Sequence, residues 1–132
     1  MTVFAAVGGQ PFFDHLVGRF YEHVADDEVL LRLYPDPIDL GPAAERLALF
    51  LGQYWGGPAT YSDRRGHPRL RMRHQPYVIG QVERDHWMAA MLDALEATLP
   101  EAPLDDEFRG QVRGQMTAYF EMAADAMVNA PA

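Results

Sequence analysis

Hydrophobic residues recur along the chain three and four positions apart, which is the spacing of amphipathic α-helices. This pattern predicts four main helices, over Pro11 to about Ala25, Pro42 to Tyr54, Gln81 to Leu99 and Leu104 to about Val128. Shorter helices are expected over residues 2–7 and 28–33. No stretch shows the alternation of a half-buried strand. The predicted fold class is therefore all-α.

Glycine and proline mark the ends of these helices. The pairs Gly8-Gly9 and Gly56-Gly57 allow sharp reversals of the backbone. Residues 58–68 are polar and interrupted by Gly and Pro, so they are expected to form a loop. A short helix is expected between Pro68 and Pro76, because proline fits the first turn of a helix and prevents its continuation.

The same periodicity assigns a face to each side chain. On the second main helix, Arg46 is expected to point away from the core. On the third, Glu83 and His86 lie off the apolar stripe, and the stripe of the last helix is expected to begin at Phe108. The side chains on the apolar stripes are therefore expected in the core or in the wall of a cavity, and the others on the surface.

Composition limits the classes of function. The 132 residues are 48% hydrophobic and suit one domain over residues 1–132. Nineteen acidic and 11 basic residues give a net charge of −8, which disfavours nucleic acid or an anionic membrane as the main partner. The absence of cysteine excludes disulfides, thiol catalysis and thioether attachment of a cofactor. Neither a long apolar run nor a leader pattern is present, so a soluble, cytoplasmic protein is expected.

The segment between Pro68 and Pro76 carries a candidate metal ligand. Leu70 and His74 are four positions apart and share one helix face, and Arg71 and Arg73 diverge from it. An imidazole can bind iron and guanidinium groups can bind carboxylates, so the segment suits a planar apolar cofactor with an iron centre and two carboxylates. The alternative is that His74 is a packed or surface histidine.

Three aromatic residues with polar tips, Tyr21, Tyr34 and Trp87, lie on otherwise apolar elements. A core that serves packing alone would more readily use Phe, because buried O–H and N–H groups need partners. These residues are therefore candidates for the wall of a pocket. The alternative is that they are ordinary core or rim residues.

Several motifs resemble one known family. They include Arg19-Phe20-Tyr21, Gln53-Tyr54-Trp55-Gly56-Gly57-Pro58, the run from Arg65-Gly66-His67-Pro68 to His74, and Glu83-Arg84-Asp85 before Trp87. From about Val3 to Asn129 the chain resembles the truncated haemoglobins, specifically the group II or haemoglobin O class. The resemblance implies a two-over-two helical sandwich, a reduced globin fold that encloses haem.

The resemblance also implies roles for individual residues. It makes His74 the proximal ligand of a pentacoordinate iron, and Arg73 a partner of a haem propionate; Arg71 is added here from its place on the helix. Haem contacts are expected from Leu47, Phe50, Leu70, Tyr34 and Trp87, and the side facing the bound gas from Tyr21, Tyr34, Trp87, Ala43 and Leu47. Val78, Met88 and Met91 are expected in the haem wall or the core. Ala43 stands where vertebrate globins carry a distal histidine, so the phenols and the indole take over its task.

The function implied is that of a non-covalent haem b protein binding O2, NO and CO, and peroxide as a further ligand. Oxygen transport belongs to the family's range. However, two hydrogen bonds to bound O2 would slow its escape about a hundredfold, which favours redox chemistry over delivery. A peroxidase or NO dioxygenase with an electron donor or reductase, working as monomer or homodimer, is the main alternative. A haem-free helical interaction domain is the other.

The role of His74 has a direct test. Replacing His74 by Ala removes the only nitrogen ligand that the resemblance assigns to the iron, so the purified variant should lack the Soret absorption band of the wild-type protein. A Soret band of unchanged intensity and position in His74→Ala would show that another residue binds the iron.

Overall fold

The computed structural model describes residues 1–66 and 77–130. These residues contain α1 (Val3–Ala6), α2 (Gln10–Ala25), α3 (Glu28–Leu31), α4 (Gly41–Tyr54), α5 (Thr60–Arg65), α7 (Gln81–Thr98), the 3-10 helix η1 (Leu99–Glu101) and α8 (Asp106–Met127). No strand occurs within them, and the predicted all-α class is confirmed. The expected short helix after Pro68, with Leu70, Arg71, Arg73 and His74, lies outside the described residues.

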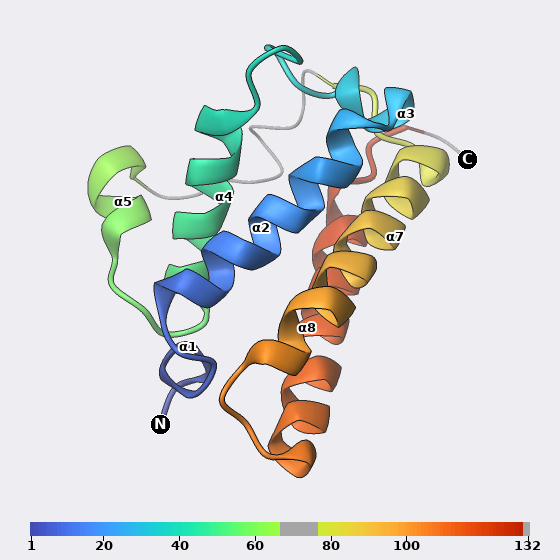
Figure 1. Ribbon diagram of the computed structural model, residues 1–132. Helices are drawn as coiled ribbons and strands as arrows, with labels where there is room; N and C mark the ends of the chain where they lie inside the picture. The colour runs from blue at the N-terminus through green and yellow to red at the C-terminus, as the bar shows by residue number, and fades with distance from the viewer. Residues whose placement is uncertain (67–76, 131–132) are drawn as a thin grey trace.

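The four longer helices form two pairs, one laid across the other (Figure 1). α2 packs against both α4 and α7, and α7 packs against α8. α3 continues from the end of α2 and contacts α7. Direct contact between α4 and α8 is sparse.

Local sequence explains where α2 begins and where α3 begins. Gly8 and Gly9 have positive φ angles of 102° and 84°, so they make the reversal between α1 and α2 that glycine permits. At the other end, the carboxylate of Asp27 accepts hydrogen bonds from the backbone N–H groups of Val29 (2.9 Å) and Leu30 (3.4 Å). This cap starts α3 and separates it from α2.

The core forms where the apolar stripes of the four long helices meet. Its largest fully buried side chains include Phe13, Phe20, Leu51, Leu95, Met116 and Phe120. Met88 and Met91, expected in the haem wall or the core, are both buried in this cluster. The helical periodicity therefore predicted most of the core.

Two expected core residues are exposed instead. Phe108 is 56% exposed, because positions four apart drift round a helix and twelve residues separate it from Phe120 by about 120°. Val78 is 73% exposed. It lies between Tyr77 and Ile79, which line a cavity, and its own side chain is turned away from that cavity.

The prediction of a loop over residues 58–68 is wrong for Thr60–Arg65, because these residues form the short helix α5. The side chain of Gln53 accepts a hydrogen bond from the backbone N–H of Ser62 (2.9 Å) and donates one to its hydroxyl (2.7 Å). Arg64 also pairs with Glu45 at 3.0 Å. Contacts with α4 thus stabilise a helix that is too short to form alone.

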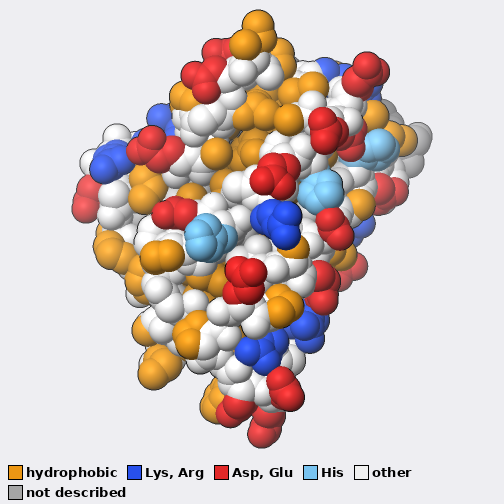
Figure 2. Space-filling view, viewed as in Figure 1, with side chains coloured by type: hydrophobic (Ala, Val, Ile, Leu, Met, Phe, Trp, Pro, Cys, Tyr) orange, Lys and Arg blue, Asp and Glu red, His pale blue; other side chains and the backbone are white. Residues whose placement is uncertain are grey.

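The surface in Figure 2 shows acidic and basic side chains interspersed over the face that α2 and α7 form. A group of hydrophobic side chains lies on the same face, between α3 and α4. Within the described part of the chain, no helix is both long and apolar enough to span a bilayer.

Gly57 is required by close packing at the end of α4. A Cβ atom there would lie 2.6 Å from the ring of Phe4 and 2.8 Å from the carbonyl oxygen of Gly52. The Gly57 N–H donates to that carbonyl (2.8 Å), and the Phe4 N–H donates to the carbonyl of Trp55 (2.9 Å). The glycine therefore lets α1 close against the end of α4.

Gly57→Ala should lower the free energy of unfolding by about 2 kcal/mol, because the added methyl group overpacks this junction. Gly114→Ala is the matched control: Gly114 lies in α8 with open space around its Cβ position, so alanine should stabilise the helix by up to about 1 kcal/mol. Urea unfolding of both variants measures the difference. Equal stability of the two variants would contradict this account of Gly57.

Candidate functional site

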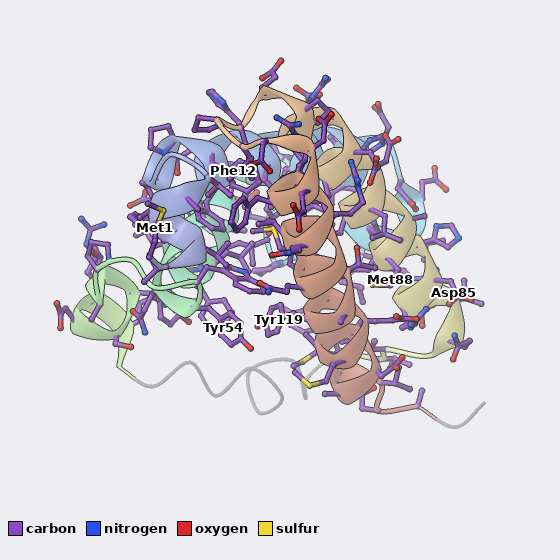
Figure 3. The ribbon with its side chains drawn as sticks, turned by 90° about the horizontal axis from the view of Figure 1, so that it is seen from below. Met1, Phe12, Tyr54, Asp85, Met88 and Tyr119 are labelled. Atoms are coloured by element: carbon purple, nitrogen blue, oxygen red, sulfur yellow. The ribbon has the colours of Figure 1, made fainter. Side chains whose placement is uncertain are left out.

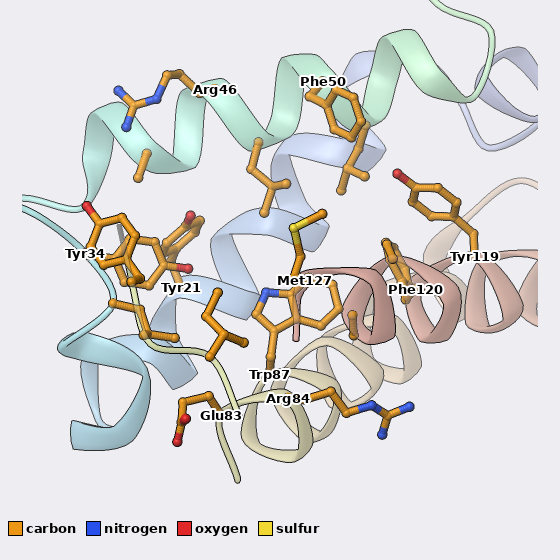
Figure 4. A pocket seen from close by; sticks show the side chains of 18 of the residues that line it. Tyr21, Tyr34, Arg46, Phe50, Glu83, Arg84, Trp87, Tyr119, Phe120 and Met127 are labelled. Carbon is orange, nitrogen blue, oxygen red and sulfur yellow. The ribbon is translucent and has the colours of Figure 1, made fainter. Parts of the chain in front are cut away.

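A cavity of about 480 Å³ lies between α2, α4, α7 and α8. Its volume is within the range of small-molecule and cofactor sites. Hydrophobic and aromatic side chains make most of its wall, and Figure 4 shows them converging from these helices. The cavity occupies the space where α4 and α8 make few direct contacts.

Two tyrosines close one end of the cavity. Tyr21 comes from α2 and Tyr34 from the corner after α3, and their ring centroids are 5.5 Å apart. Each hydroxyl group influences the pKa of the other. Figure 4 shows both rings at the end of the cavity near Arg46.

Both tyrosines are neutral hydrogen-bond donors at physiological pH. Burial raises the pKa of Tyr21, although the neighbouring hydroxyl of Tyr34 and the charge of Arg46 act in the opposite direction. Burial, and then the neighbouring Tyr21, raises the pKa of Tyr34 well above its ordinary value. A hydroxyl group that stays protonated keeps an O–H that can donate a hydrogen bond into the cavity.

Trp87 on α7 projects into the middle of the cavity (Figure 4). Phe20 and Phe120 hold its ring edge-on, with centroid distances of 5.4 and 5.9 Å. Within residues 1–66 and 77–130, its indole N–H has no hydrogen-bond acceptor. The indole is thus a fixed donor that points at whatever fills the cavity.

α4 supplies the facing wall through Ala43, Leu47 and Phe50. Phe50 is 8% exposed and packs against the ring of Tyr61 from α5, with centroids 5.5 Å apart. This wall is apolar and carries no side-chain hydrogen-bond donor of its own at these three positions.

The comparisons with known proteins bear on this arrangement. The family model "Bacterial-like globin" matches residues 2–123. The chain belongs to the bacterial-like globin family, among the group II truncated haemoglobins. It is 36% identical to the group 2 truncated haemoglobin YjbI of Bacillus subtilis over 121 residues, which are 92% of this chain and 84% of that protein.

Solved structures of bacterial haemoglobins share the fold of this globin. The thermostable haemoglobin of Thermobifida fusca is 53% identical, with a TM-score of 0.89 over all of both chains. The haemoglobin of Chloroflexus aurantiacus is 45% identical, with a TM-score of 0.87 over 98% of this chain and 99% of that one. The group II truncated haemoglobin of Bacillus anthracis is 33% identical, with a TM-score of 0.86 over 100% of this chain and 99% of that one. Membership of this family implies binding of haem and of a gaseous ligand.

The cavity brings together six of the residues singled out from the sequence of this globin, namely Tyr21, Tyr34, Ala43, Leu47, Phe50 and Trp87. Leu70, Arg71, Arg73 and His74 fall outside the described residues. The six come from α2, the corner after α3, α4 and α7, so only the tertiary fold makes them neighbours.

Arg46 was expected to point outward but lines the cavity. It lies three positions after Ala43 and four before Phe50, both in the apolar wall, so its position on the helix already indicated this face. Arg46 forms no ion pair with any acidic residue in 1–66 or 77–130. An unpaired guanidinium at the edge of an apolar cavity suits a carboxylate of a bound ligand.

Tyr119 is a second cavity residue that the sequence analysis missed. Its ring lies 4.0 Å from that of Tyr54, centroid to centroid, and Figure 3 shows the two side by side. Burial, and then the neighbouring Tyr54, raises the pKa of Tyr119 to about 12. Its hydroxyl therefore stays protonated and adds no charge to the cavity.

Glu83 was expected off the buried face of α7, but it is only 8% exposed and borders the cavity. Its carboxylate accepts hydrogen bonds from the N–H of Gly80 (2.8 Å) and from the guanidinium of Arg32 (3.1 Å). The Gly80 hydrogen bond lowers the pKa of Glu83 more than burial raises it, and Arg32 lowers it further. Nearby, His86 and Asp27 form a second link between α7 and the start of α3, at 2.8 Å.

Glu83→Gln should lower the free energy of unfolding by about 1 kcal/mol at neutral pH, because the pair with the exposed Arg32 loses its charge. The lowered pKa of Glu83 means that this stabilisation is present above pH 4.5, the group's ordinary pKa, and is lost as the pH falls below it. Urea unfolding from neutral to acid pH should show the two proteins converging. Glu101→Gln, an exposed position, is the control, and a pH-independent difference for Glu83→Gln would refute the prediction.

Proposed function

We propose that the chain holds haem b without a covalent bond and presents Tyr21, Tyr34 and Trp87 to a diatomic ligand, for redox chemistry with O2, NO or peroxide rather than for delivery of O2. The observation that carries the proposal is the convergence of two phenols and one indole, from three separate elements, on one apolar cavity. Bound haem supplies an iron atom that takes up the diatomic ligand. The chain supplies everything that orients and retains that ligand.

The residues around the cavity fit a haem group. Leu47 and Phe50 offer an apolar wall to a flat ring, and Arg46 offers a guanidinium with no acidic partner in the described residues to a propionate. The resemblance adds His74 as the proximal ligand, Leu70 as a further apolar contact, and Arg73, with Arg71, as propionate partners. The chain would thus bind both the apolar body and the charged edge of the cofactor.

The donors favour retention of a ligand that carries negative charge. Each hydrogen bond from a phenol or an indole in a dry cavity contributes about 1 kcal/mol or more, and two together would slow dissociation about a hundredfold. A carrier must release its ligand readily, whereas a protein that reduces or oxidises the ligand benefits from holding it. Ala43, where a histidine would block the way, leaves a small route of entry beside the donors.

A haem-dependent peroxidase or NO dioxygenase is the second candidate function. It is favoured by the oxidisable phenol and indole groups at the cavity, which can give up single electrons. It also requires an electron donor or reductase that returns the protein to its starting state. The decisive difference is turnover: an enzyme consumes peroxide or NO repeatedly with a reductant, whereas a binding protein reacts once per haem.

The absorption spectrum of the purified, reduced protein with and without CO tests the proposal. A Soret band that shifts on addition of CO is expected. A colourless protein that also fails to take up added hemin would refute haem binding. Repeated turnover of NO or peroxide in the presence of a reductant would then favour the enzyme over the binding protein.

Tyr34→Phe and Trp87→Phe should each raise the dissociation rate of O2 by about tenfold, because each removes a donor that contributes about 1.4 kcal/mol. Tyr54→Phe is the matched control, since Tyr54 is 49% exposed and does not line the cavity. Stopped-flow displacement of O2 by CO measures the rates. Unchanged rates in both cavity variants would show that these side chains do not contact the ligand.

A further inference from the structure

The residues after α8 turn back onto the segment that precedes α7. The backbone N–H groups of Asn129 and Ala130 both donate to the carbonyl of Ile79, at 2.8 and 3.1 Å. The side chain of Asn129 adds two more hydrogen bonds. Its Oδ1 accepts from the N–H of Ile79 (2.8 Å) and its Nδ2 donates to the carbonyl of Tyr77 (2.8 Å).

These four hydrogen bonds determine which side chains the segment turns to the cavity. Tyr77 and Ile79 line it, and Ile79 is only 6% exposed, whereas Val78 between them points outward. A shift of one residue along this segment would bring Val78 to the cavity in place of Ile79. The hydrogen bonds to Asn129 fix the register that places Ile79 inside.

Asparagine is suited to this position because its side chain holds a donor and an acceptor together. Aspartate could accept from the N–H of Ile79, but its second oxygen would face the carbonyl of Tyr77. Alanine could make neither bond. Asn129 itself is exposed and does not line the cavity, so its effect on a ligand there is indirect.

A separate link joins the same ends of α7 and α8. The guanidinium of Arg84 pairs with Asp125 at 2.8 Å and lies 3.8 Å from Glu121. This ion pair connects the two helices but does not involve the backbone of residues 77–79. That backbone is held by the hydrogen bonds with Asn129 and Ala130.

We propose that Asn129 is a positioning residue for the haem pocket: its amide holds residues 77–79 against the end of α8, so that Tyr77 and Ile79 keep their places in the wall. This inference rests on the proposed function, in which the cavity holds haem. Asn129 acts through the wall and does not touch the cofactor.

The test compares Asn129→Ala and Asn129→Asp with Gln115→Ala, which removes an exposed amide that makes no hydrogen bond in the described part of α8. Two readouts are used on the full chain: amide hydrogen exchange at Ile79, and the rate of haem loss to an excess of apomyoglobin. Asn129→Ala should speed both by about fivefold, the change expected for two hydrogen bonds in an exposed setting. For Asn129→Asp, both rates should lie between those of the wild type and those of Asn129→Ala. For Gln115→Ala, both rates should match the wild type.

The melting temperature separates positioning from general stability. Asn129→Ala should melt near the wild type, with faster exchange confined to residues 77–80 and the end of α8. Faster exchange throughout the chain, or unchanged exchange and haem loss, would overturn the inference. If the wild-type protein fails to take up haem, both the proposed function and this inference are overturned. If the wild type takes up haem but the Asn129 variants exchange amides and lose haem at the wild-type rates, only the role of Asn129 is overturned.

Discussion

Polar atoms inside an apolar cavity are the constraint on which the rest of this structure depends. A buried O–H or N–H without a partner costs about 1–3 kcal/mol. The rings of Tyr21 and Tyr34 pack against each other, and the indole N–H of Trp87, which has no acceptor in the described residues, faces the open space of the cavity. The fold keeps donors where packing alone would favour phenylalanine, which is understandable in a family that binds haem and a gaseous ligand.

The contacts that hold these donors lie mostly outside the cavity. Asp27 caps α3 and also pairs with His86, which immediately precedes Trp87. Two residues before Tyr34, Arg32 pairs with Glu83. These two links between α3 and α7 tie the corner that carries a phenol to the helix that carries the indole. The relative positions of the donors thus depend on these two polar contacts between α3 and α7 as well as on packing within the cavity.

The sequence predicted the cavity side chains that lie on a regular helical stripe or in a distinctive motif. Ala43, Leu47 and Phe50 follow the stripe of α4, and Tyr21 and Trp87 belong to motifs shared with the truncated haemoglobins. Arg46 and Glu83 were missed because polarity was taken to mean exposure. A charged side chain can border a cavity when a cap, an ion pair or a ligand's carboxylate compensates it, and the helical pattern alone does not contain those partners.

The sequence by itself determined the number, type and approximate ends of the main helices, because these follow from the 3.6-residue period and from the conformations that Gly and Pro allow or forbid. Only the tertiary structure decided the conformation of Thr60–Arg65, the outward turn of Val78 and the contacts of Asn129. Each depends on hydrogen bonds or packing between different elements, such as Gln53 of α4 with Ser62 of α5, or Asn129 after α8 with Ile79 before α7. Interactions of that kind have no local periodicity, so they exist only once the helices have come together.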